Sequence, residues 1–136
     1  MNFHWSGFIN VARQLHDESE HDAEPESKVR CAVSRFYYGA FCYTRDYMIQ
    51  NCKFQSSNNY EDHSHIRDFL RSLGKSQLAD AATDLQTLHE WRKTCDYRSD
   101  KNRSDPTKWS KKASEMASKI IDAVDCYAKE RQSHQR

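Results

Sequence analysis

The segment Glu26-SKVRCAVSRFYYGAFCYTRDYM-Ile49 decides the fold, because its apolar residues recur every three or four positions along its whole length. Pro25 suits the first turn of a helix, and Glu24 and Glu26 are favourable near the positive end of that helix. The spacing therefore predicts one long helix from about Pro25 to Asn51. Its apolar face consists of Val29, Val33, Phe36, Tyr37, Ala40, Thr44, Tyr47 and Met48.

A second face of the same predicted helix carries basic and aromatic side chains. Basic groups interleaved with aromatic rings can bind phosphates and stack bases. The simpler interpretation is that each basic side chain extends along the bundle and keeps its charged end in water. A helix with two usable faces also has more contact surface than one core needs, which favours a homodimer. This second face consists of Lys28, Cys31, Arg35, Tyr38, Cys42 and Arg45.

The rest of the chain is also helical in its spacing. Only three glycines and two prolines occur in 136 residues, which leaves few turn residues for a many-stranded sheet. We expect an all-α fold, an up-and-down bundle of four main helices plus a short one. Apolar stripes predict the further helices around residues 5–15, 66–73, 78–95 and 109–127, with a loop over 53–62.

One domain is expected over residues 1–136, since the chain is long enough for one core but not for two. Within it, residues 1–24 form an N-terminal helix and an acidic loop. Residues 129–136 are polar and form a frayed tail.

The net charge of +1 does not mark the whole chain as a nucleic-acid binder, but the charge is unevenly distributed. The stretch from Asp17 to Glu26 holds six acidic residues and no Lys or Arg. The stretch from Arg92 to Lys112 holds eight basic residues and three acidic ones. Both runs fit solvated loops and helix ends, and the basic run also fits a surface that contacts phosphates.

The five cysteines form no C-x-x-C pair, so we expect free thiols, mostly buried, in a reducing cytoplasm. His63 and His65 are two residues apart and would point to different sides of a helix, so they predict no metal site. His63 itself either caps the third helix or lines a pocket. We find no cofactor motif, no signal peptide and no apolar stretch near ~18 residues, which together predict a cytoplasmic protein without a cofactor and without membrane contact.

The most informative candidates for chemistry lie in the segment Leu88-HEWRKTCDYRS-Asp100. Asp96 follows Arg92 by four residues, so the two can pair on one helix face, and His89 lies one turn earlier. An ordinary surface pair of this kind is worth only about 0.2–0.5 kcal/mol. The functional interpretation is that Arg92 holds a phosphate through two hydrogen bonds while a polar neighbour orients a proton. The candidate catalytic residues are Arg92, Asp96 and Tyr97, and the candidate RNA- or nucleotide-binding residues are Arg35, Tyr38, His89, Arg98, Lys101 and Arg103.

Two motifs in these segments resemble those of the HEPN-domain superfamily of bacteria and archaea. The run Val29-RCAVSRFYYGAF-Cys42 is similar to the helix R-x-A-x-S-R-x-Y-Y-A-A-F, and Leu85-QTLHEWRKTCD-Tyr97 is similar to the ending L-x-x-L-R-x-x-A-D-Y. The likeness extends from about Ser27 to Ile121. It implies a small helical bundle that usually dimerises. Many members are metal-independent ribonucleases of toxin–antitoxin, CRISPR or phage-defence systems, and others bind nucleotides or RNA without cutting.

The nuclease motif of that superfamily is an arginine, a polar residue next to it, and a histidine separated from the arginine by four to six residues. Arg92 matches the arginine and Lys93 takes the polar position, but Tyr97, Arg98 and Ser99 occupy the histidine positions. The resemblance therefore implies an RNA-acting protein, a ribonuclease or toxin with a non-standard motif. The alternative is a catalytically inactive module that binds a nucleotide, RNA or a protein partner such as a cognate antitoxin or a nucleotidyltransferase. A helical adaptor with solvated charge clusters is the third interpretation.

Overall fold

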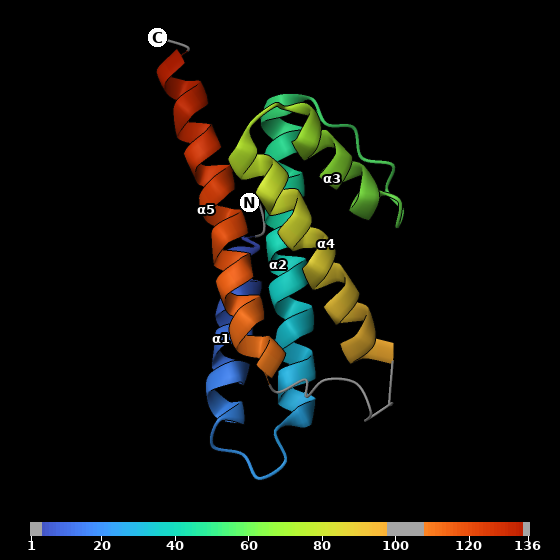
Figure 1. The fold of residues 1–136 in the computed structure, drawn as a ribbon, viewed down its shortest axis with the longest axis vertical. Helices are drawn as coiled ribbons and strands as arrows, with labels where there is room; N and C mark the ends of the chain where they lie inside the picture. The colour runs from blue at the N-terminus through green and yellow to red at the C-terminus, as the bar shows by residue number, and fades with distance from the viewer. Residues whose placement is uncertain (1–3, 98–107, 135–136) are drawn as a thin grey trace.

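The computed structural model describes residues 4–97 and 108–134, and within them the chain forms five helices and no strand. Four long helices run alternately down and up the long axis (Figure 1). A short helix, the third along the chain, lies beside the start of the long helix that follows it. The predicted all-α bundle of four main helices plus a short helix is confirmed. The helices are α1 (Ser6–Ser19), α2 (Glu26–Cys52), α3 (Asp62–Ser72), α4 (Ser76–Tyr97) and α5 (Trp109–His134).

The central element is α2, which packs against α1, α4 and α5. Most of its predicted apolar face is buried, including Val29, Phe36, Tyr37 and Met48. Burying a large apolar side chain of this kind stabilises the fold by about 1.5–3 kcal/mol. The three-four spacing of α2 therefore determines which side of this helix meets the core.

The helices α1 and α2 approach each other closely at Gly39. A Cβ atom at this position would lie 2.6 Å from Cδ1 of Ile9, whose side chain is buried. Only glycine leaves room for this contact, since close-packed interiors do not yield easily to an added methyl group. Gly39 thus sets how near α1 lies to α2.

Three side chains of the second face of α2 make contacts within the chain. The guanidinium carbon of Arg35 lies 5.4 Å from the centre of the Phe8 ring on α1. Lys28 forms an ion pair of 2.7 Å with Asp22. The ring of Tyr38 lies 5.2 Å from the guanidinium carbon of Arg92 on α4. Cys31 and Arg35 are nevertheless exposed, so part of this face remains on the surface.

The helix α5 continues to His134, although the sequence predicted a frayed tail from Lys129. Nη1 of Arg131 donates a hydrogen bond of 2.6 Å to the backbone oxygen of Asn51 and lies 2.9 Å from Sγ of Cys52. These contacts dock the last turns of α5 on the C-terminal end of α2. The helix is continuous over residues 129–134, and polar composition does not reveal such a docking partner distant in sequence.

All five cysteines are free, as predicted, but only Cys42 and Cys95 are buried. Cys31 and Cys126 are exposed and Cys52 is half-buried, so the expectation of mostly buried thiols was wrong. Within the described ranges, no helix has the length and apolar character needed to cross a membrane. In the same part of the chain, no three or more His, Cys, Asp or Glu side chains gather where they could bind a metal ion.

Candidate functional site

The residue at the centre of the candidate site is Arg92 on α4, which is only 8% exposed. Its guanidinium carbon lies 5.2 Å from the ring centre of Tyr38 and 5.9 Å from those of Tyr37 and Tyr97. Aromatic faces attract a cation, and the attraction reaches about 2 kcal/mol or more when the cation is removed from water. Three rings from α2 and α4 therefore hold a positive charge inside the bundle.

Arg92 has little negative charge around it. Its Nη1 atom lies 3.5 Å from Oδ2 of Asp96, and its buried Nε atom has no hydrogen-bond partner among the described residues. Asp96 is shared, since Oγ of Ser34 also donates a hydrogen bond to it at 3.5 Å. A buried cation needs close acceptors to offset the loss of water. Arg92 is thus a desolvated cation with fewer acceptors than it can use.

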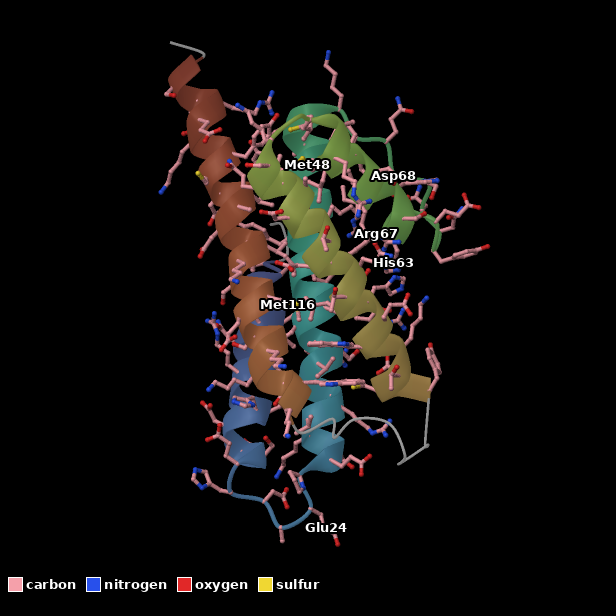
Figure 2. All side chains as sticks on the ribbon, in the orientation of Figure 1. Glu24, Met48, His63, Arg67, Asp68 and Met116 are labelled. Carbon is pink, nitrogen blue, oxygen red and sulfur yellow. The ribbon has the colours of Figure 1, made fainter. Side chains whose placement is uncertain are left out.

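The short helix α3 adds two side chains that sequence reasoning did not place in the site. His63 and Arg67 lie one turn apart on α3, on the side toward α4 (Figure 2). Nη1 of Arg67 lies 3.4 Å from Nδ1 of His89, and the rings of His63 and His89 stack at 4.6 Å. The ring of Tyr37 stacks on His89 at 5.0 Å. We call this group the Arg92 cluster, which consists of Tyr37, Tyr38, His63, Arg67, His89, Arg92, Asp96 and Tyr97.

Two hydrogen bonds occupy the Nδ1 atoms of the histidines. The hydroxyl of Tyr37 lies 2.5 Å from Nδ1 of His63, and this is the only hydrogen bond of that hydroxyl among the described residues. Burial raises the pKa of the Tyr37 phenol far above its ordinary value, so the hydroxyl keeps its proton and can donate it to this bond. Arg67 can only donate, so Nδ1 of His89 accepts. His89 therefore carries its proton on Nε2 and presents an N–H donor there, and His63 does the same when Tyr37 donates to it.

Both histidines are neutral at physiological pH. Burial, reinforced by neighbouring cationic groups, lowers the pKa of His63 to about 4 and that of His89 to about 3. Arg67 adds a second cation and makes no ion pair among the described residues. The cluster thus offers two guanidinium groups and two neutral N–H donors against one carboxylate, that of Asp96. This balance suits an anion.

The structure brings most of the described site residues that the sequence predicted into one cluster and places one of them elsewhere. Arg92, Asp96 and Tyr97 lie together, and Tyr38 and His89 join them. Arg35 lies elsewhere, over Phe8 of α1, and does not belong to the cluster. The remaining three predicted positions fall outside the described residues, and they are Arg98, Lys101 and Arg103.

A sequence signal for His63 and Arg67 did exist. The two are four residues apart and so share one helix face, whereas His63 and His65 do not. His63 lines a pocket, which was one of its two expected roles. Which neighbour that face would meet is not encoded in α3 alone.

Comparisons with protein-family models, curated proteins and solved structures found no match to this chain. The likeness to HEPN domains therefore rests on the two motifs themselves.

Proposed function

We propose that this chain is a HEPN-family RNA- or nucleotide-binding protein whose Arg92 cluster receives a phosphate group. The observation that carries the proposal is the state of Arg92, a cation only 8% exposed with one carboxylate 3.5 Å away and a buried Nε without a partner among the described residues. A phosphate brings further acceptors to a guanidinium that has few, and guanidinium groups bind phosphate through paired hydrogen bonds.

Arg67, His63 and His89 support the same ligand. Arg67 is a second cation beside the first, and neutral imidazole N–H groups donate to phosphate oxygens without requiring protonation. The exposed ring of Tyr97 and the half-buried ring of Tyr38 are suited to stack on bases. A phosphate with attached bases is therefore favoured over a small inorganic anion.

The tautomers favour binding over cleavage. A general base must accept a proton near neutral pH, but the Nδ1 atoms of both histidines are occupied by Tyr37 and Arg67, and His89 carries its proton on Nε2. Asp96 is engaged with Arg92. General acid–base assistance contributes about 10²- to 10⁴-fold to a rate, so cleavage without it is slow. The catalytically inactive module is accordingly the first candidate.

Metal-independent ribonuclease activity, as in a toxin or defence component, is the second candidate, and one observation favours it. The motif position at Tyr97 lacks a histidine, but two imidazoles from α3 and α4 lie beside Arg92. Either imidazole would have to exchange its proton between ring nitrogens to act as a base. Incubating labelled RNA with the protein in EDTA and comparing wild type with His63→Gln tests this candidate directly.

Fluorescence anisotropy of a labelled single-stranded RNA tests the binding proposal. We expect Arg92→Gln and Arg67→Gln each to weaken binding by about 10- to 150-fold, since a hydrogen bond to a charged group contributes about 1.5–3 kcal/mol. Binding should also weaken with salt, because counterions are released from the phosphates. Arg71→Gln is the matched control, because Arg71 has the same charge, lies on the same helix and pairs with Asp68.

Circular dichroism identifies any variant that fails to fold, and Arg67, which is only half-buried, tolerates substitution better than Arg92. Wild-type protein that does not bind RNA refutes the proposal. Equal losses of RNA affinity in Arg67→Gln and Arg71→Gln also refute it, because the net charge of the protein alone would then explain the binding.

We also propose that the chain forms a homodimer in which two Arg92 clusters face one groove, as the resemblance implies. Tyr97 supports this arrangement, since it is 77% exposed and lies against Arg92. Sedimentation at tens of micromolar tests it, and a monomer at that concentration refutes it. A cytoplasmic setting and a protein partner such as an antitoxin or a nucleotidyltransferase belong to the same proposal.

A further inference from the structure

An open pocket of about 450 Å³ adjoins the Arg92 cluster, between α2 and the loop that leads into α3. Tyr38 and His63 belong to both, since they line the pocket while the Tyr38 ring lies 5.2 Å from the guanidinium carbon of Arg92. Small-molecule sites commonly measure about 300–1,000 Å³. The ring of Tyr38 would therefore lie between a group bound in the pocket and a phosphate held by Arg92.

We infer that this pocket holds the base of the nucleotide whose phosphate occupies the Arg92 cluster. This inference rests on the proposed function and names the part of the ligand that the pocket receives. The pocket wall is aromatic, with Phe41 stacked on His63 at 4.3 Å and Tyr38 edge-on to His63 at 6.2 Å. Tyr60 lines the same pocket and is 81% exposed. Aromatic side chains in such positions bind bases by stacking, whatever the base.

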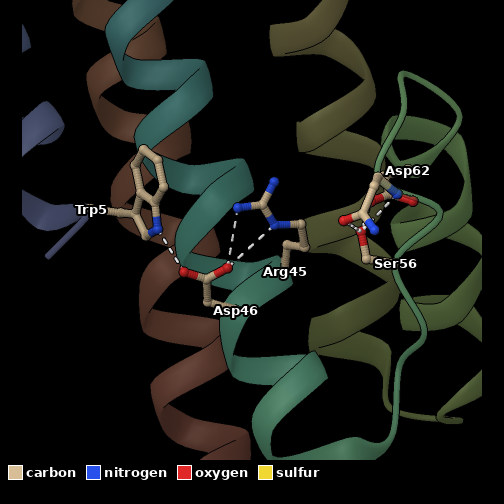
Figure 3. A network of polar contacts seen from close by, with 6 residues as sticks. Trp5, Arg45, Asp46, Ser56 and Asp62 are labelled. Carbon is tan, nitrogen blue, oxygen red and sulfur yellow. Dashed lines mark hydrogen bonds and ion pairs between the residues drawn. The ribbon is translucent and has the colours of Figure 1, made fainter. Parts of the chain in front are cut away.

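The charges of the pocket favour a neutral base over a phosphate. Asp46 accepts hydrogen bonds from Nε1 of Trp5 at 2.6 Å and from Arg45 at 3.2 Å (Figure 3). Asp62 is buried and accepts from Ser57 through both its backbone nitrogen and its hydroxyl. Among the described residues, Arg45 is the one guanidinium in the pocket wall, and the carboxylates of Asp46 and Asp62 lie near it. The pocket therefore has no excess positive charge, whereas the Arg92 cluster has one.

The loop also presents hydrogen-bond donors to the pocket. The amide oxygen of Asn59 accepts from the backbone nitrogen of Glu61 at 2.8 Å. With its oxygen occupied, this pocket-lining amide offers its NH₂ group, which donates to no other described residue. Such donors can reach acceptor atoms on a base edge.

The test compares two ligands of equal charge, a short oligoadenylate and an abasic ribose-phosphate oligomer of the same length. Isothermal titration measures the affinity of the wild type and of Tyr60→Ala, Tyr60→Phe and Arg67→Gln. Tyr60 is exposed, so neither of its substitutions disturbs the core.

We expect Tyr60→Ala to weaken oligoadenylate binding by about 5- to 150-fold, the effect of losing one base–aromatic stack, and to leave abasic binding unchanged. Tyr60→Phe should keep the wild-type affinity, since it retains the ring. Arg67→Gln should weaken both ligands alike. If both oligomers bind equally well and Tyr60→Ala changes neither, the base pocket is refuted while the phosphate site stands. If neither oligomer binds, both proposals are refuted.

Discussion

Lowering the pH below neutrality should destabilise this protein by protonating His63 and His89. An unfolded histidine binds a proton with a pKa of about 6.5, whereas the pKa values in the folded state are lowered to about 4 and about 3. Between these values the unfolded chain carries more protons than the folded one. The stability that the neutral rings contribute is therefore complete above pH 6.5 and is lost as the pH falls toward 4 and below.

The size of the effect follows from the number of protons. Each extra proton bound by the unfolded chain lowers the free energy of unfolding by about 1.4 kcal/mol per pH unit, so two histidines give at most about 2.7 kcal/mol per unit. Both rings are only half-buried, and solvent screens part of their interaction with the arginines. We therefore expect the two to contribute about 1–2 kcal/mol per pH unit near pH 5.

Urea denaturation between about pH 7 and pH 4.5 measures this slope. The control is the double variant His63→Gln, His89→Gln, which keeps every carboxylate but cannot titrate at these two positions. Its free energy of unfolding should fall less steeply with pH than that of the wild type. Equal slopes in the two proteins would show that neither histidine is held neutral, and the description of both as N–H donors would then be wrong.

Three further outcomes are expected. Gly39→Ala should destabilise the fold by about 1–3 kcal/mol through overpacking, while Gly7→Ala, where an added Cβ meets nothing within 4 Å, should not, as denaturant midpoints would show. Tyr37→Phe should release the tautomer of His63, and nitrogen-15 NMR of the ring would contradict this if its shifts matched those of the wild type. Arg131→Gln should lower the hydrogen-exchange protection of the last turns of α5, and unchanged protection would exclude docking as the cause of their order.

Local spacing alone determined the helices and part of the site. A three-four repeat of apolar residues places one face of a helix inward whatever its neighbour, so α2 and α4 were predictable from Val29 onward and from Leu78 onward. Arg92 and Asp96 are four residues apart on one helix, and their pairing needs no tertiary information.

Only the tertiary structure decided which side chains surround Arg92. Tyr37 of α2 meets His63 of α3 across 26 residues of sequence. Arg67 meets His89 across 22 residues, because α3 packs against α4. Arg35 and Tyr38 lie on the same side of α2 by spacing, yet one meets α1 and the other α4. The periodicity of a helix determines which of its residues face inward, but the neighbour that each residue meets depends on how the helices pack.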